Sequence, residues 1–300
     1  MFGAILGDII GSSYEFRPYK GKDFPLFTPV SRFTDDTVMT LAVAQGFMDV
    51  LETEKASLSG SDRLGDLGPE QAKQERPVGK EGSSVQTLST LAVPLQEALT
   101  RRMREFGLRH RDAGYGPSFL RWLEDPKAGP YYSFGNGSAM RVSAVAWLFD
   151  DLDQVIWAAR LQAGLTHNHP EGLKGAEAVA ACIFLARQQA SKADIKRYVR
   201  ETFAYNLDRS LDDIRPSYGF EVSCQHSVPE AILAFLEGQD FEDCIRNAVS
   251  LGGDADTQAA IAGGIAEAYY GLSDTWRTRI EDYLPDDLLE VVRHFQKSIK

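Results

Sequence analysis

The residues of this chain best suited to chemistry lie near its C-terminus, in the run Gly252-Gly-Asp-Ala-Asp-Thr257. Two glycines free the backbone for a tight turn. Two aspartates one residue apart then precede a threonine that opens a predicted helix, which ends at Gly271. A single oxygen-bearing side chain is enough to cap the free N–H groups of a helix start. Three such side chains in four positions indicate a further role, such as binding a metal ion.

A second predicted helix start repeats this pattern. Thr34-Asp-Asp-Thr37 precedes an apolar segment that we expect to be helical from Val38 to Met48. If the two starts face each other, their four carboxylates repel, and protonation or bound cations must relieve the repulsion. Oxygen ligands suit magnesium, manganese or calcium rather than zinc. Either cluster alone is more simply explained as a double helix cap, so the metal-site interpretation depends on the two clusters meeting.

Three further stretches carry polar groups that could face a ligand. Glu15 follows a short helix predicted over residues 2–14, whose glycines would allow close packing; a surface position explains Glu15 equally well. Gly135-Asn-Gly-Ser138 precedes a helix predicted over residues 139–149 and could bind an anion, although a plain capped turn also explains it. The histidines of Thr166-His-Asn-His-Pro170 lack the partners of a structural zinc site, which favours hydrogen bonding near a ligand.

Length and composition restrict the function. The 300 residues carry a formal net charge of −11, which argues against a broad surface for nucleic-acid backbones. No apolar run approaches the roughly 20 residues of a membrane span, and the N-terminus lacks the basic region of a signal peptide. Cys182, Cys224 and Cys244 show no paired-ligand spacing, so we expect reduced thiols in a cytoplasmic protein. A thiol nucleophile at Cys224 beside His226 is disfavoured, because no acid nearby would orient the histidine.

Helical periodicity runs through the chain and convincing strands are scarce. We therefore predict an all-α fold in one compact domain over residues 1–300. Residues 87–109 carry an apolar stripe typical of a half-buried helix, and residues 274–298 read as an amphipathic helical pair. Residues 53–86 are rich in glycine, proline and charge, which predicts a polar insert or loop between two helices.

Four motifs in order give the chain a specific resemblance. From Gly3 to about Gly271 it is similar to the ADP-ribosylglycohydrolase family, which includes dinitrogenase reductase-activating glycohydrolase. Residues 53–86 match nothing that we can place in that family, and Ala255 stands where several members carry Thr, Ser or Cys. The motifs that carry the resemblance are Thr34-Asp-Asp-Thr37, Gly135-Asn-Gly-Ser-Ala-Met-Arg141, Thr166-His-Asn-His-Pro170 and Gly252-Gly-Asp-Ala-Asp-Thr257.

The resemblance implies an orthogonal bundle of helices with two magnesium or manganese ions in a central cleft. Its implied catalytic residues are Glu15, Asp36 and Asp256. The residues implied to line an ADP-ribose pocket are Gly135, Asn136, Gly137, Ser138 and His167. The implied metal ligands are Thr34, Asp35, Asp36, Asp254, Asp256 and Thr257.

The implied reaction is hydrolysis at C1″ of an ADP-ribosyl group attached to a protein or a small molecule. Such cleavage passes through an oxocarbenium-like state. Paired metal ions can orient ribose hydroxyls and hold a water. Glu15 could take a proton from that water or give one to the leaving group. Tyr14, Tyr131 or Tyr132 could stack on adenine.

Two other functions compete with this one. All-α prenyl-diphosphate enzymes also gather aspartates around magnesium, but they use an Asp-Asp-x-x-Asp pattern, whereas Asp35-Asp36 is followed by Thr37-Val38-Met39. A non-catalytic ADP-ribose-binding protein, or a structural relative such as a lens crystallin, is the second alternative. Retention of both acidic helix starts and of Glu15 argues against it.

Overall fold

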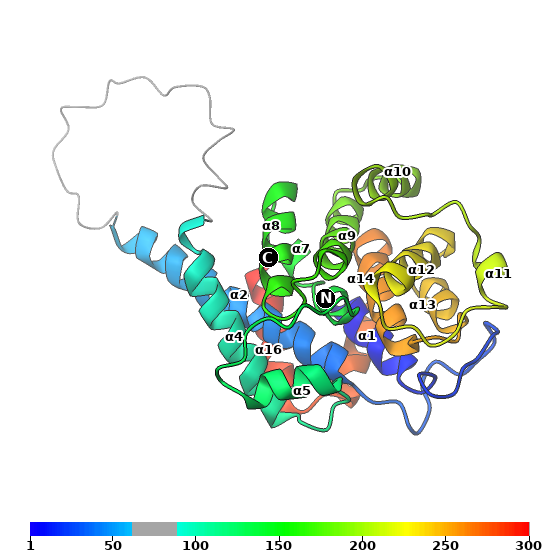
Figure 1. Ribbon diagram of the computed structural model, residues 1–300, viewed down its shortest axis with the longest axis horizontal. Helices are drawn as coiled ribbons and strands as arrows, with labels where there is room; N and C mark the ends of the chain where they lie inside the picture. The colour runs from blue at the N-terminus through cyan, green and yellow to red at the C-terminus, as the bar shows by residue number, and fades with distance from the viewer. Residues whose placement is uncertain (62–88, 300) are drawn as a thin grey trace, which may run out of the picture.

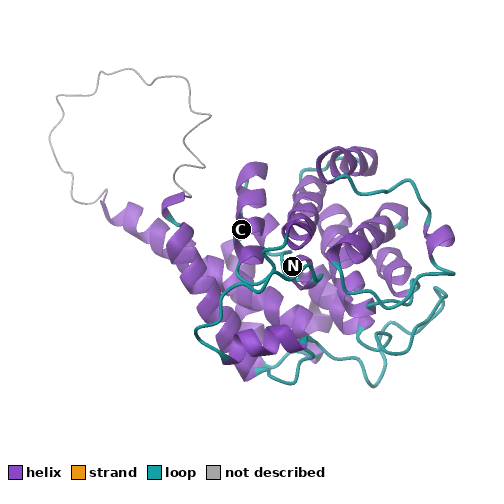
Figure 2. Cartoon of the chain, in the orientation of Figure 1, coloured by secondary structure: helices purple, strands orange, loops and turns teal. Residues whose placement is uncertain are grey.

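The structure is a computed structural model that describes residues 1–61 and 89–299. Within these ranges every regular element is a helix, and the only strand-like pairing is an isolated antiparallel bridge between Gly135 and Ser223 (Figure 2). The predicted all-α class is therefore confirmed. None of the helices in the described part combines the length and apolar character needed to cross a membrane.

The helices vary widely in length. They are α1 (Phe2–Gly11), α2 (Asp35–Ser61), α4 (Ala92–Arg109), α5 (Pro117–Glu124), α6 (Gly137–Met140), α7 (Val145–Leu148), α8 (Leu152–Gly164), α9 (Pro170–Arg187), α10 (Lys192–Phe203), α11 (Leu211–Ile214), α12 (Cys224–Glu237), α13 (Phe241–Val249), α14 (Ala255–Tyr270), α15 (Asp274–Arg279), the 3₁₀ helix η1 (Ile280–Asp282) and α16 (Asp286–Ser298).

Helices α1 and α14 form the centre of the arrangement. In Figure 1, α2, α4 and α16 lie to the left of this pair, α12 and α13 lie to its right, and α9 lies above it. All residues of α1 are buried, and α14 is buried from Ala255 to Ala268. A helix that is apolar or small on all faces belongs in the interior, because it has no polar face to offer to water.

Glycines let α1 approach α14 far more closely than ordinary side chains would allow. A Cβ atom at Gly7 would lie 2.0 Å from the carbonyl oxygen of Ala259. Cβ atoms at Gly3 and Gly11 would lie 2.1 and 2.4 Å from carbonyl oxygens of the same helix. The contacts run in opposite directions along the two sequences, so the helices are antiparallel. The end of α1 therefore meets the start of α14.

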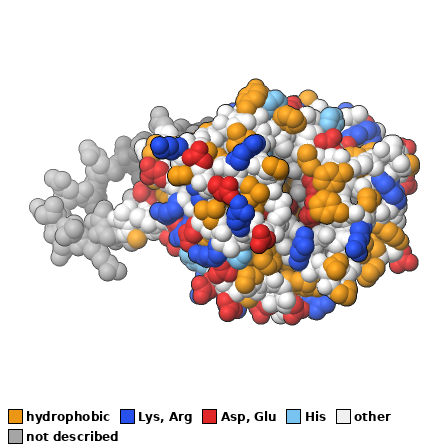
Figure 3. Space-filling view, turned by 60° about the horizontal axis from the view of Figure 1, so that its bottom comes forward, with side chains coloured by type: hydrophobic (Ala, Val, Ile, Leu, Met, Phe, Trp, Pro, Cys, Tyr) orange, Lys and Arg blue, Asp and Glu red, His pale blue; other side chains and the backbone are white. Residues whose placement is uncertain are grey.

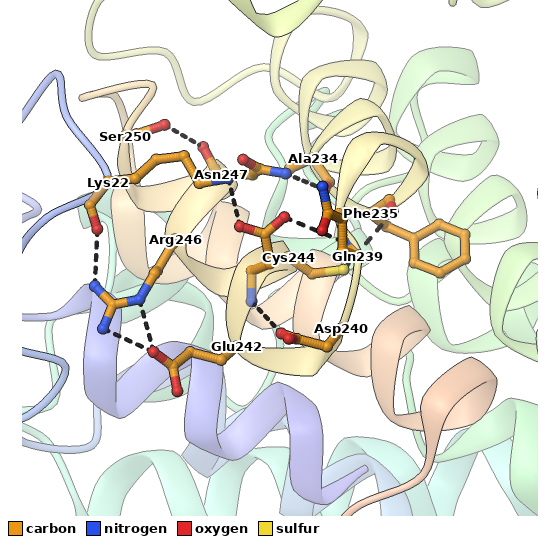
Figure 4. Close-up of polar contacts among 12 residues, drawn as sticks. Lys22, Ala234, Phe235, Gln239, Asp240, Glu242, Cys244, Arg246, Asn247 and Ser250 are labelled. Atoms are coloured by element: carbon orange, nitrogen blue, oxygen red, sulfur yellow. Dashed lines mark hydrogen bonds and ion pairs between the residues drawn. The ribbon is translucent and has the colours of Figure 1, made fainter.

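The loop that joins α1 to α2 is fastened to α13 by one arginine (Figure 4). The guanidinium of Arg246 donates to the carbonyl oxygens of Lys22 and Phe24, each at 2.8 Å. One residue further on, Asn247 donates its side-chain amide to the carbonyl of Ala234 in α12, at 3.1 Å. The two bonds of Arg246 satisfy loop carbonyls that would otherwise lack partners. They also hold the connection between the two acidic ends of α1 and α2.

Two predicted elements differ in the structure. The helix expected over residues 139–149 is broken into α6 and α7, because Arg141 turns inward at the break to bond Gln162 and Thr166. Helix α2 continues to Ser61, so the start of the predicted polar stretch 53–86 is helical. Residues 62–86 of that stretch lie outside the described residues.

We predict that Gly7→Ala lowers the free energy of unfolding by about 3 kcal/mol or more, because the new methyl would collide with backbone that cannot yield. Chemical denaturation measures the change. Gly164→Ala is the control, since a Cβ there meets no atom within 4 Å at the end of α8. Alanine at this position should alter stability by at most about 1 kcal/mol, towards greater stability. Equal stability of the two variants would contradict the close contact.

Candidate metal and ligand site

Asp8 joins the first two helices at the base of the site. This carboxylate is fully buried in α1 and accepts hydrogen bonds from the backbone N–H and the hydroxyl of both Thr34 and Thr37, at 2.5 to 3.0 Å. Each threonine thus offers a pair of donors at the start of α2. Burial raises the pKa of Asp8 to about 6, although these donors favour the charged form.

The two acidic helix starts meet, which is the condition on which the metal-site interpretation depends. Single carboxylate oxygens of Asp8, Asp36 and Asp256 all lie within 4.8 Å of one another. Oxygens of Glu15, Asp254 and Asp256 form a second group of the same size. Asp256 belongs to both groups and therefore connects them. The glycines before α14 make this possible, since Gly252 has a left-handed φ of 64° and Gly253 packs against Tyr218.

The other expected metal ligands occupy different positions around these groups. The Thr34 hydroxyl is engaged with Asp8 at 2.7 Å. Thr257 donates its hydroxyl to Asp36 Oδ2 at 3.1 Å. Asp35 belongs to neither group of converging oxygens, but it lines the cleft in front of them. The structure thus brings all six residues to one region, with the acids of α2 and α14 at its centre.

The carboxylates strongly oppose one another's ionisation. Burial, followed by the charge of Asp256, raises the pKa values of Asp35 and Asp36 well above their usual range. Burial and Asp254 have the same effect on Asp256. At the edge of the cluster, burial and the charge of Asp256 raise the pKa of Glu15 to about 8. The cluster is therefore costly to ionise unless positive charge enters it.

One buried oxygen atom supports the presence of a cation here. Asp36 Oδ1 is buried and has no hydrogen-bond partner, although buried carboxylate oxygens almost always have one. The surrounding donor atoms are carboxylate and hydroxyl oxygens, the set that hard divalent cations such as Mg²⁺, Mn²⁺ or Ca²⁺ prefer. The residues present therefore fit a metal centre.

A cleft of about 540 Å³ opens in front of the acids. That volume suits a small organic ligand. Its lining includes the apolar or aromatic side chains of Tyr115, Phe119, Tyr131, Phe220 and Val222. In Figure 3 a furrow crosses the surface, acidic side chains are visible inside it, and hydrophobic side chains gather along its edge.

The predicted ligand loop lies beside the acids, but its side chains are not all turned towards the cleft. Gly135, Asn136 and Gly137 line the cleft. Asn136 donates its side-chain amide to Asp254 Oδ2 at 2.7 Å and so orients that carboxylate. The hydroxyl of Ser138 donates to the carbonyl of Gly172 at 2.7 Å, which fixes the loop against α9. Ser138 is thus a support of the loop, whereas the other three face the cleft.

The two histidines of the Thr166–Pro170 motif have different roles. His167 lines the cleft and is buried, and burial followed by the charge of Arg141 lowers its pKa well below the usual range. His169 accepts the N–H of Glu171 at 3.1 Å and caps α9. The thiol of Cys224 is buried under the ligand loop, which raises its pKa to about 12 and removes it as a nucleophile.

Sequence reasoning missed two residues of the site. Asp8 was not recognised, although an acid inside an otherwise apolar helix is itself a signal, since an unpaired buried charge needs a reason. Arg141 stands out in the sequence only as the last residue of a motif, yet it is buried and lines the cleft. Of the three tyrosines suggested for adenine stacking, Tyr131 lines the cleft, whereas Tyr14 packs against Phe24 away from it.

Comparison with known proteins agrees with this geometry. ADP-ribosylhydrolase ARH3 of Homo sapiens is 26% identical, and the alignment covers 99% of this chain and 92% of that protein. ADP-ribosylarginine hydrolase Tri1 of Pseudomonas putida (strain GB-1) is 25% identical over 91% of this chain and 70% of that protein. A solved structure described as an ADP-ribosylglycohydrolase-related protein complex shares the fold, with a TM-score of 0.60 at 22% identity over 99% of this chain and 93% of that one. The sequence model of the ADP-ribosylglycohydrolase family matches residues 1–299, and the chain therefore belongs to that family.

Proposed function

We propose that this protein hydrolyses the bond between C1″ of an ADP-ribosyl group and its acceptor, with two divalent cations, Mg²⁺ or Mn²⁺, in the cleft. The observation that carries this proposal is the meeting of buried carboxylates at the base of a cleft, with Asp36 Oδ1 left without a partner. Family membership supports the reaction class, and the activities in the names of ARH3 and Tri1 agree with it.

The position of each residue determines its proposed role. Asp35, Asp36, Asp254 and Asp256 would hold the cations, with the hydroxyls of Thr34 and Thr257 beside them. Asp8 is surrounded by four donors, so it holds the start of α2 in place. When bound, the cations supply Lewis-acid polarisation and orient hydroxyl groups or water.

Glu15 is the residue best placed to transfer a proton. It lies half-exposed in the cleft wall, next to Asp256, whose charge adds to burial in raising the pKa of Glu15 to about 8. That pKa belongs to the metal-free protein, whereas the position of Glu15 in the cleft wall suits either donation to a leaving group or removal of a proton from water.

The lining of the cleft also includes a cation, which suits a ligand that carries negative charge. Arg141 is buried in this lining, and its described hydrogen bonds go to neutral groups, Gln162 and Thr166. A buried cation without a paired carboxylate attracts an anion, because the low-dielectric interior weakens the field little. An ADP-ribosyl group combines hydroxyls, which suit the acids, with a diphosphate, which suits the guanidinium.

The direct test is release of free ADP-ribose from a panel of substrates. The panel consists of ADP-ribosyl-arginine, ADP-ribosyl-serine, ADP-ribosylated nucleic acid and O-acetyl-ADP-ribose, each with Mg²⁺, with Mn²⁺ and with chelator. Metal-dependent release from one substrate supports the proposal and names the acceptor. ADP-ribose binding without release from any of them identifies a non-catalytic binding protein instead.

Removing the shared carboxylate should abolish turnover without unfolding the protein. We predict that Asp256→Asn lowers kcat/KM on the order of 100-fold or more, since losing even an outer partner of a metal costs 10–100-fold. The free energy of unfolding without metal should not fall, because the amide removes one charge from a repelling cluster. Asp150→Asn is the control, an acid 95% exposed whose one ion pair within the described residues is with Arg187. Full turnover of Asp256→Asn at low metal would refute the site assignment.

The raised pKa values predict how stability depends on pH in the absence of metal. Asp8 and Asp254 keep protons up to about pH 6 in the folded state, and Glu15 up to about pH 8, whereas their unfolded values are 3.8 and 4.5. The folded protein therefore binds more protons than the unfolded chain in this window, and its stability falls as pH rises from about 4 to about 8.

Thermal unfolding with chelator should show this decrease, and saturating Mg²⁺ should raise the Tm more at pH 8 than at pH 5, since ions bind the ionised cluster. A Tm in chelator that is constant or rises across this range would contradict the repulsion between the acids.

A further inference from the structure

Arg141 is the centre of a buried hydrogen-bond network that reaches the ring of His167. Its Nε donates to Gln162 Oε1 at 2.8 Å, and its Nη2 donates to the carbonyl of Gln162 and to Thr166 Oγ1, each at 3.0 Å. Gln162 in turn donates to the carbonyl of Ser138 at 2.9 Å. The guanidinium has only donors, so every partner must accept from it.

This fixed direction determines where the Thr166 proton points. Thr166 Oγ1 is fully buried and accepts from Arg141, and it lies 2.7 Å from His167 Nδ1. Among the described residues its hydroxyl makes no other hydrogen bond. If His167 Nδ1 carried a proton, the hydroxyl proton would have no acceptor, and a buried unsatisfied donor costs about 1–3 kcal/mol. The hydroxyl therefore donates to Nδ1.

His167 must then carry its single proton on Nε2. The ring is neutral, because burial and the nearby guanidinium both disfavour a second proton. Nε2 faces the ligand loop, since it lies 3.1 Å from the Cβ position of Gly137 and 3.5 Å from that of Gly135. No hydrogen bond of Nε2 occurs within residues 1–61 and 89–299. An unused N–H therefore lies against the ligand loop, in the lining of the cleft.

We propose that Arg141 and Thr166 are positioning residues that lock His167 in the Nε2–H tautomer, so that it donates a hydrogen bond to an oxygen of the ligand beside Gly135 and Gly137. The identity of the ligand as ADP-ribose rests on the proposed function. The tautomer does not, because it follows from the direction of the network alone. Glycine on both sides of Nε2 leaves the space that such a ligand oxygen needs.

The tautomer can be read by NMR of the full-length protein labelled with ¹⁵N-histidine. The chain has five histidines, and His167→Asn assigns the signals. We expect an unprotonated Nδ1 and a protonated Nε2 in the wild type. Thr166→Val has the same shape without the hydroxyl and should lose this pattern, while Thr166→Ser should keep it. A wild-type Nδ1 that carries the proton, or a pattern unchanged in a folded Thr166→Val, would overturn the proposal.

Titration with ADP-ribose supplies the second readout. Thr166→Val should bind about tenfold more weakly, the loss expected for one well-placed hydrogen bond, and Thr166→Ser should restore the affinity. Unchanged affinity in a Thr166→Val protein that has lost the tautomer would refute the contact with the ligand. A wild type that fails to bind ADP-ribose refutes the proposed function instead, and the NMR pattern still decides the tautomer.

Discussion

The cleft depends on one packing contact, the close approach of α1 and α14. Three glycines spaced four residues apart put one face of α1 directly against carbonyl oxygens of α14. Because the two helices are antiparallel, the acids of α1 and of the residues after it lie beside those that start α14. Asp8 then holds the start of α2 through four hydrogen bonds, so a third chain segment reaches the same point. A larger residue in the contact would separate groups that must lie within a few ångströms.

The contact between α1 and α14 also brings carboxylates close together. The fold tolerates their repulsion because protons or cations can neutralise them. Without metal, protons neutralise the acids, as the raised pKa values of Asp36 and Asp256 show. In the proposed reaction, divalent cations would neutralise the same oxygens by binding to them. Proteins often place destabilising groups where function requires them and compensate elsewhere. Here the compensation is an almost wholly buried pair of helices, whose apolar and close-packed surfaces offset the repulsion at one end.

Parts of the site that repeat a pattern could be recognised from the sequence, whereas residues that occur once could not. The two acidic helix starts indicated a shared metal site, because one shared chemistry explains both better than two separate caps. Asp8 has no such counterpart, and its role arises from tertiary contacts with Thr34 and Thr37. The break between α6 and α7 was equally hidden, since periodicity does not show that Arg141 turns inward. Local patterns thus predicted the helix class and the acids, while single inward-facing polar residues required the structure.

The cleft is lined by groups of opposite charge, and the two kinds are built differently. Helix starts bring the carboxylates together, and their charge changes with protons or metal ions. Arg141 instead makes its described hydrogen bonds with neutral groups, and burial followed by the charge of Arg141 lowers the pKa of His167 well below its usual range. Asn136 bonds Asp254, and the chain of bonds from Arg141 through Gln162 reaches the carbonyl of Ser138, so hydrogen bonds from both kinds of group meet in one loop.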